Sequence, residues 1–393
     1  MPMPAVGDVV GPLDVGPVAH GGHFVAHHDG RVLFVRHALP GERVTVRLTQ
    51  VNASVLRGDA IEIQHAADDR VEPPCTAFGP GGCGGCDFQH IAVARQRELK
   101  ADVLRDQLRR LARLEWDGEV EAVPGDDGGL GWRTRARYLV SAGRLGMRAH
   151  RSHRFVALPA EGCLLAVPAL RRPALADGRL ERVRESRGRG GRGQTREREL
   201  VVMAGPDGRP LARGAATTLR VGERPFRLTG ESFWQVHPGA AAALAEAVVT
   251  GLAPAPGETA LDLYCGAGLF VGVLAERGVA VAGVEGNSAA VALARRNVPE
   301  ASFAVGDVAR ALVEAHATDL VVLDPPRVGA GRAVMAAILA RAPRAVAYVA
   351  CDPAALARDL ADLPPEYAVT SIRAFDLFPM TQHVETVAIL SRR

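Results

Sequence analysis

DLYCGAG, from Asp262 to Gly268, is the stretch that decides the fold, because it joins an apolar, β-rich run to the start of an alanine-rich helix. Glycine has no side chain, so Gly266 and Gly268 allow a ligand to approach the backbone at a helix N-terminus. The third glycine of a GxGxxG dinucleotide motif is absent, since Val271 occupies its position. The stretch therefore predicts a ligand-binding turn and argues against a nicotinamide dinucleotide.

Strands and helices alternate around this turn from about residue 232 onward. Such alternation predicts a doubly wound sheet with helices on both faces, so we expect an α/β fold with a Rossmann-like, seven-stranded sheet. The expected strands are Thr259–Cys265, Ala280–Glu285, Ser302–Asp307, Asp319–Asp324, Ala345–Cys351, Ala368–Phe375 and Val384–Leu390.

Two acidic residues end the second and third of these strands. Ligands of doubly wound sheets bind beyond the carboxyl ends of the strands, where Glu285 can accept both hydroxyl groups of a ribose. Asp307 is placed to meet an adenine amino group. Each acid taken alone could equally cap the following helix. Their occurrence at successive strand ends favours an adenosine-containing ligand.

A second set of reactive residues follows the later strands. Asp324-Pro325-Pro326-Arg327 forms a stiff, extended turn, because proline fixes the backbone and lacks an N–H donor. Cys351 ends the fifth strand and Glu385 lies in the last, so both can face one pocket. A buried structural cysteine is the common alternative, but a strand end followed by a helix favours a reactive thiolate. Asp352 could raise the pKa of that thiol; we expect it to cap the helix instead.

Six cysteines in 393 residues are too few for a disulfide scaffold, and three of them lie within twelve residues, at Cys75, Cys83 and Cys86. In a reducing compartment this pattern indicates a metal site, with zinc and iron both possible from the spacing.

Charge is distributed unevenly along the chain. Residues 91–230 contain 29 Arg and Lys residues against 17 Asp and Glu residues, and a basic block of this kind suits an RNA backbone. The alternative is an arginine excess that reflects base composition, since Lys100 is the only lysine. Within the block, about residues 182–198 form a Gly/Arg-rich stretch, expected to be a mobile insertion that either binds RNA or is a solvated loop.

No apolar stretch approaches the roughly 18 residues of a membrane span, and the N-terminal residues lack a signal-peptide pattern. We therefore expect a cytoplasmic protein with no membrane partner, and a monomer, because no surplus apolar heptads are present. Residues 6–65 alternate apolar and polar positions between glycine-containing turns, which predicts a small antiparallel barrel. A helix is expected at about Val93 to Leu114.

These residues together resemble a known family, the TRAM-containing RNA (uracil-5-)-methyltransferases that use S-adenosylmethionine. GRVLFVRHALPGERV (Gly30 to Val44) is similar to the TRAM domain, an OB-like RNA-binding barrel, and FWQVHP (Phe233 to Pro238) and FPMTQHVETVAIL (Phe378 to Leu390) match other family segments. The resemblance implies three domains: a TRAM domain at 1–68, an α+β central domain at 69–230 and the methyltransferase domain at 231–393.

The resemblance also implies roles for single residues. Cys351 would add to C6 of a uracil that is flipped out of its RNA, and Glu385 would remove the C5 proton after methylation. Cys163 would join the three clustered cysteines in a [4Fe–4S] site, with zinc as the alternative. The expected cofactor-binding residues are Gln235, Tyr264, Gly266, Gly268, Glu285, Asp307 and Asp324, and the expected metal ligands are Cys75, Cys83, Cys86 and Cys163.

Two departures from the family pattern are present: Leu269 stands where an Asn is frequent, and CDP replaces CNP at Cys351. Two other functions remain open. A cytosine-5 RNA methyltransferase typically carries a second cysteine in the acidic-Pro loop, and residues 324–327 have none. A non-catalytic RNA-binding module would show the same charge distribution. The sequence does not distinguish ribosomal from transfer RNA as the substrate.

Overall fold

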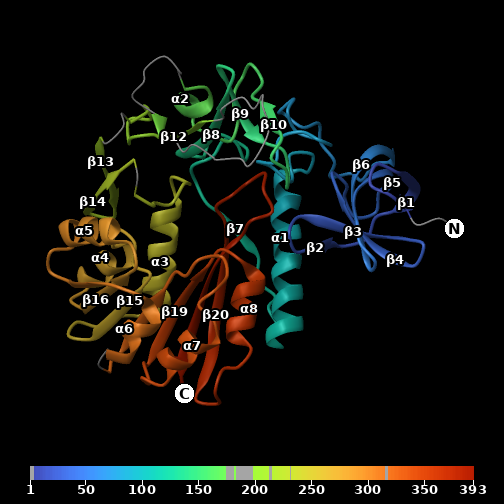
Figure 1. Cartoon of the computed structure of the whole chain (residues 1–393). Helices are drawn as coiled ribbons and strands as arrows, with labels where there is room; N and C mark the ends of the chain where they lie inside the picture. The colour runs from blue at the N-terminus through green and yellow to red at the C-terminus, as the bar shows by residue number, and fades with distance from the viewer. Residues whose placement is uncertain (1–3, 174–180, 183–197, 212–214, 231, 315–316) are drawn as a thin grey trace, which may run out of the picture.

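The computed structural model describes residues 4–173, 181–182, 198–211, 215–230, 232–314 and 317–393. Apart from its two end residues, the Gly/Arg-rich stretch at 182–198 falls outside these ranges. Figure 1 shows a barrel at one side, a β-rich part above, and a large sheet with helices below. None of the described helices is long and apolar enough to span a membrane.

The N-terminal strands form one sheet in the order β1-β5-β6-β4-β3-β2 within the described residues. Alternate side chains point inward, and Phe24, Leu33, Val44 and Leu56 are fully buried. The expected antiparallel arrangement is wrong at one place, because β4 and β6 pair in parallel. The strands are β1 (Val9–Asp14), β2 (Val18–Ala19), β3 (His23–His28), β4 (Arg31–Arg36), β5 (Arg43–Val51) and β6 (Val55–His65).

The long helix α1 (Val93–Gln107) lies between the barrel and the C-terminal sheet in Figure 1 and continues as a π-helical turn, η1 (Leu108–Ala112). The helix expected at 93–114 is thus present. Beyond it, a second sheet has the order β10-β9-β8-β12-β11. The remaining central elements are β8 (Arg135–Ser141), β9 (Arg144–Arg148), β10 (Phe155–Ala157), α2 (Pro168–Arg171), β11 (Glu181–Arg182), β12 (Arg198–Met203), β13 (Ala216–Val221) and β14 (Arg224–Thr229).

The C-terminal sheet has the order β17-β16-β15-β18-β19-β21-β20-β7 in the described part of the chain. All seven expected strands are present. The expected total of seven is wrong, because β7 (Val120–Ala122) from the central region pairs in parallel with β20 as an eighth strand. The other strands are β15 (Thr259–Leu263), β16 (Ala280–Glu285), β17 (Ser302–Val305), β18 (Leu320–Leu323), β19 (Ala345–Ala350), β20 (Tyr367–Asp376) and β21 (Glu385–Arg392).

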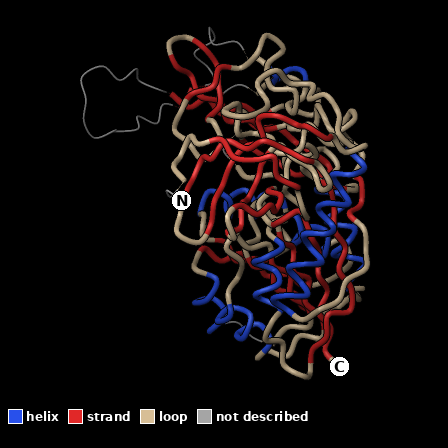
Figure 2. The backbone as a smooth tube through the Cα atoms, turned by 90° about the vertical axis from the view of Figure 1, so that its right-hand side faces the viewer, coloured by secondary structure: helices blue, strands red, loops and turns tan. Residues whose placement is uncertain are grey.

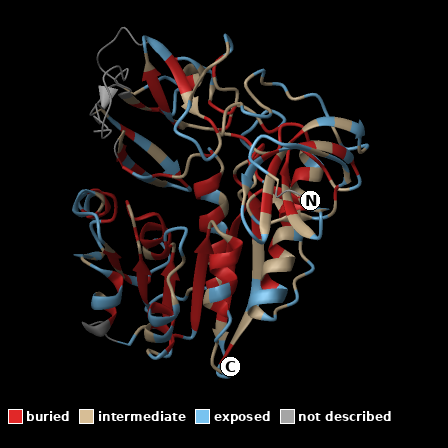
Figure 3. Ribbon diagram, turned by 45° about the vertical axis from the view of Figure 1, so that its right-hand side comes forward, coloured by how far each residue is buried: buried red, intermediate tan, exposed pale blue. Residues whose placement is uncertain are grey.

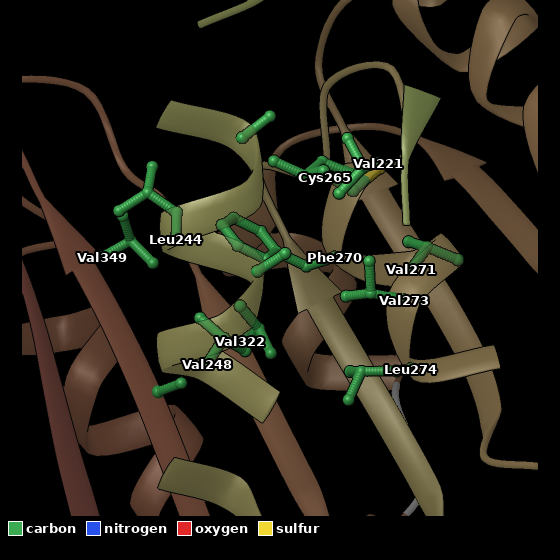
Figure 4. Packing of buried hydrophobic residues seen from close by; sticks show 14 of the residues in the cluster. Val221, Leu244, Val248, Cys265, Phe270, Val271, Val273, Leu274, Val322 and Val349 are labelled. Carbon is green, nitrogen blue, oxygen red and sulfur yellow. The ribbon is translucent and has the colours of Figure 1, made fainter. Parts of the chain in front are cut away.

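Helices lie against both faces of this sheet (Figure 2). Its central strands are therefore buried (Figure 3). On one face, Leu244 and Val248 of α3 pack with Phe270 of α4 against Val322 and Val349 of the sheet (Figure 4). The opposite face carries α1, η1, α6, α7 and α8. The bounds are α3 (Ala240–Leu252), α4 (Leu269–Ala275), α5 (Ser288–Asn297), α6 (Val308–Glu314), α7 (Arg332–Leu339) and α8 (Pro353–Leu360).

Strand direction determines where the site lies. The strands β15 to β19 run parallel, so their carboxyl ends meet at one edge of the sheet. Strand β21 runs antiparallel to β19, which brings its first residue, Glu385, to that same edge.

Candidate active site

The turn after β15 has the geometry that its glycines predict. Gly268 has φ 93° and precedes α4, and Tyr264 has φ 62°, a left-handed conformation that is uncommon for a non-glycine residue. Beneath the turn, the fully buried Asp262 accepts a hydrogen bond from the Val271 backbone N–H at 3.1 Å. Burial, followed by the charge of Asp324, raises the pKa of Asp262 well above its usual value. The side chain of Asp262 therefore fixes the turn from below.

The two acids expected beside an adenosine ligand lie at the next strand ends. Glu285 accepts hydrogen bonds from the backbone N–H groups of Gly266 (3.2 Å) and Asn287 (2.7 Å), so its carboxylate is held directly beside the turn. Asp307 accepts from the Arg310 N–H at 3.1 Å, which is the helix-capping arrangement that the sequence left as an alternative. Both acids line the same cleft.

The reactive residues meet at the other end of that cleft. Cys351 follows β19, Asp324 follows β18, and Glu385 is 3% exposed at the start of β21. Thr386 donates a hydrogen bond from its Oγ1 to the Ala350 carbonyl at 3.0 Å. This bond fixes the strand of Glu385 to the strand of Cys351.

The surroundings of Cys351 do not favour the thiolate that the sequence predicts. Burial, and then the neighbouring Glu385, raise the pKa of Cys351 to about 12, although Arg327 acts in the opposite direction. Burial also raises the pKa of Asp324. Burial, and then the charge of Asp324, raise the pKa of Glu385. The protein's own groups therefore keep the Cys351 thiol protonated, because a thiolate there would stand beside two carboxyl groups in a buried cleft.

One continuous cleft of about 1260 Å³ joins these positions, more than the roughly 300–1,000 Å³ of a typical small-molecule pocket. It has room for a cofactor and a base together. Among the predicted catalytic and cofactor-binding residues, Gly268 alone does not line it; this glycine lies behind the turn, where an added Cβ would meet Ala294 and Val298 at 3.4 Å. The predicted residues that line it are Gln235, Tyr264, Gly266, Glu285, Asp307, Asp324, Cys351 and Glu385.

Some lining residues were given no role by the sequence. Phe233 is 65% exposed although it is a large apolar residue at the cleft, and Arg327 lies within 3.3 Å of His383. In the sequence, only their closeness to the predicted site residues Gln235 and Asp324 could have indicated that Phe233 and Arg327 line the cleft. Asp352 caps α8 as expected, by accepting from the Ala355 N–H at 2.8 Å, and also contacts His20 of the barrel at 3.1 Å. Cys265, within the turn, is buried and packs in the core.

Four cysteines line a separate cavity between the segment before α1 and the central sheet: Cys75, Cys83, Cys86 and Cys163. The Gln89 side-chain amide donates to the Cys86 sulfur at 3.0 Å, and the Gly85 N–H donates to the Cys83 sulfur at 3.4 Å. Within the described ranges, no three His, Cys, Asp or Glu side chains are grouped closely enough for a single metal ion. The donor set is thus four thiols around a shared cavity.

Comparison with known proteins gives a consistent result. A family model described as "TRAM domain" matches residues 10–61, and one described as "tRNA (Uracil-5-)-methyltransferase" matches residues 308–393. An uncharacterized RNA methyltransferase of Streptomyces avermitilis is 44% identical over 96% of this chain and 97% of its own length. The 23S rRNA (uracil(1939)-C(5))-methyltransferase RlmD of Methylococcus capsulatus is 33% identical over 97% of this chain and 98% of its own.

A solved structure shares the whole fold. The tRNA (uracil-54, C5)-methyltransferase of Pyrococcus abyssi, in complex with S-adenosyl-L-homocysteine, aligns with a TM-score of 0.72 and 24% identity, covering 96% of this chain and 99% of that one.

Proposed function

Because this chain belongs to the TRAM-containing RNA (uracil-5-)-methyltransferases, we propose that it methylates C5 of a uridine in ribosomal or transfer RNA. The observation that carries the proposal is the single cleft that joins the cofactor turn at Gly266 to Cys351 and Glu385. Ribosomal RNA is the first substrate to test, because the RlmD relatives align over nearly their full length.

S-adenosylmethionine supplies the methyl group, as an electrophilic carbon on a sulfonium. The backbone around Gly266 and Gly268 would take the cofactor beside α4, with Glu285 on the ribose and Asp307 near the adenine. Gln235, Tyr264 and Asp324 would lie near the sulfonium end. In support, all of these except Gly268 line one cleft.

The chain's own residues can carry the rest of the reaction. Once the Cys351 thiol has lost its proton to solvent, the thiolate forms a bond to C6 of the uracil, and the displaced electron pair makes C5 a nucleophile that takes the methyl group from the sulfonium. Glu385 then accepts the C5 proton; the electron pair of the C5–H bond forms the C5–C6 double bond, and the C6–S bond breaks to free the thiolate. Glu385 suits the acceptor role because burial raises its pKa.

We further propose that Cys75, Cys83, Cys86 and Cys163 hold a [4Fe–4S] cluster. The shared cavity of the four thiols and the N–H donors to two of the sulfurs support this proposal, since four cysteine thiolates are the usual ligands of such a cluster. Iron, sulfide and zinc analysis of anaerobically purified protein tests this assignment.

The function is tested with labelled S-adenosylmethionine and RNA from a host that lacks the modification. Label in 5-methyluridine, carried by one RNA, is the expected result, and Cys351→Ala should abolish it. Label in 5-methylcytidine would identify a cytosine-5 enzyme. Intact RNA binding with no label would identify a binding module. A monomeric state and a cytoplasmic location stay predictions, the first of which light scattering can test.

A further inference from the structure

The loop between β20 and β21, residues 377–384, ends directly at Glu385. Any movement of this loop moves the group to which the proposed function assigns removal of the C5 proton. Asp376, the last residue of β20 before the loop, is 2% exposed, and Met380 in the middle of the loop is 5% exposed. Its backbone is therefore held inside the protein, and the groups that hold it come from the central region.

Lys100, the only lysine in the chain, holds the start of this loop. It lies on α1 with its side chain fully buried, and its Nζ contacts Asp376 Oδ1 at 2.6 Å and donates to the Phe378 carbonyl at 3.0 Å. Burying an ammonium group is costly unless it is paired and hydrogen-bonded. The pair therefore fixes the distance between α1 and the loop.

Gln96, one turn earlier on α1, holds the middle of the loop. Its Oε1 accepts from the Met380 N–H at 2.8 Å, and its Nε2 donates to the carbonyls of Ile91 (2.8 Å) and Phe88 (3.1 Å). Met380 has φ 65°, in the left-handed region that a non-glycine residue adopts only when its surroundings impose it. Gln96 supplies one of the bonds that impose it.

The third contact comes from the segment that carries the clustered cysteines. The N–H groups of Asp87 and Phe88 both donate to the Met380 carbonyl at 3.0 Å, and the Asp87 side chain accepts from the Gln382 N–H at 3.2 Å. Asp87 directly follows Cys86 in the chain. In addition, Met380 packs in one buried cluster with Cys86, Trp132 and Leu165.

We propose that Asp87, Gln96 and Lys100, here called the loop clamp, are positioning residues for Glu385, and that the clamp depends on the four-cysteine site. None of the three lines the cleft, so they act through the loop and do not contact the uracil. The four-cysteine site anchors the clamp because Gln89 joins Cys86 to the Cys75 backbone, with bonds of 3.0 and 3.2 Å. The inference rests on the proposed function for the role of Glu385.

The first test is Gln96→Leu, with Gln107→Leu as the matched control on the same helix. Gln107 contacts Asp106 and does not reach the loop. If Glu385 is misplaced, removal of the C5 proton slows and the methylated uracil stays bound to Cys351. Gln96→Leu should therefore accumulate a methyl-labelled RNA–protein adduct, seen on a denaturing gel, at least about tenfold above wild type. Peptides covering residues 377–384 should also exchange their amide hydrogens faster. Unchanged adduct and unchanged exchange would overturn the role of Gln96.

A second variant separates positioning from folding. Lys100→Met alone leaves Asp376 buried without its cation and will destabilise the protein. Combining Lys100→Met with Asp376→Asn removes the unpaired charge, and we expect the melting temperature to recover while the adduct still accumulates. If the adduct disappears when stability recovers, Lys100 acts only on folding and has no positioning role.

The dependence on the four-cysteine site is tested by removing the metal with a chelator under anaerobic conditions. Faster hydrogen exchange at 377–384, with unchanged exchange at the sheet strands β16 and β17, supports the coupling. Unchanged exchange at 377–384 refutes it. Hydrogen exchange is measured without RNA and without activity. It therefore still tests whether the clamp holds the loop if the wild-type protein makes no 5-methyluridine, a result that would reject only the proposed function.

Discussion

Alkylation of Cys351 across pH tests the electrostatics of the cleft. An ordinary cysteine has a pKa of about 8.5, whereas burial and Glu385 raise that of Cys351 to about 12. At pH 8 the thiolate fraction is then about 10⁻⁴ instead of about one quarter, a deficit on the order of 10³-fold. A more basic thiolate is more nucleophilic, with a Brønsted slope of about 0.4–0.5, which offsets roughly 1.5 decades. Iodoacetamide should therefore modify Cys351 on the order of 50-fold more slowly in the folded protein than in urea.

The measurement is mass spectrometry of the Cys351 peptide over time at several pH values. Glu385→Gln removes one cause of the raised pKa, so this variant should be alkylated faster than wild type at pH 8. Cys265 is an internal control, because its raised pKa comes from burial, Asp262 and Glu285, and should not respond to Glu385→Gln. An apparent pKa for Cys351 at or below 8 in the folded protein would refute the reasoning.

Three further predictions concern other parts of the molecule. Glu285→Gln should weaken S-adenosylmethionine binding by about 10- to 100-fold, the effect of a lost charge-assisted hydrogen bond, and leave RNA binding unchanged; calorimetry measures the first and a gel shift the second. Asp352→Ala should cost about 1 kcal/mol of stability through loss of the α8 cap. Burial alone would raise the pKa of Asp352, but His20 and the Ala355 N–H lower it, so this contribution is present above the unfolded pKa and is lost as pH falls through the folded pKa. Arg70→Met leaves the fully buried Glu42 without its cation and should lower the free energy of unfolding by about 3–5 kcal/mol. Urea denaturation, followed with a probe in the barrel, measures this loss.

The sequence predicted the C-terminal sheet well because its strands are continuous apolar runs. Each of the seven expected strands is present, with ends within two residues of the expected ones. The eighth strand, β7, was missed because Val120–Ala122 is too short to show a periodic pattern. The parallel pairing of β4 with β6 was missed because strands joined by short turns normally pair antiparallel, and β5 lies between them in the chain.

The sequence predicted those parts of the candidate site whose position is determined by the carboxyl ends of the strands. Glu285, Asp307, Asp324 and Cys351 all follow or end parallel strands, so one topological rule brings them to one edge. The charge state of Cys351 was not predictable, because it depends on a carboxyl from another strand. Nor was the loop clamp: in the sequence, Lys100 looks like any surface charge between apolar helix positions, and only the tertiary structure buries it against Asp376.

The protonated thiol has a consequence for the order of events. Asp324, Cys351 and Glu385 are three acids in one buried cleft, with Arg327 as a neighbouring cation. Their charged forms repel each other, so the protein alone favours the neutral thiol. A sulfonium cation bound near Asp324 would lower the pKa of all three acids, and Cys351 would become nucleophilic only beside the methyl donor. S-adenosylmethionine should therefore speed alkylation of Cys351, whereas S-adenosylhomocysteine, whose sulfur is neutral, should not. Equal effects of the two ligands would show that the order is set by shape and not by charge.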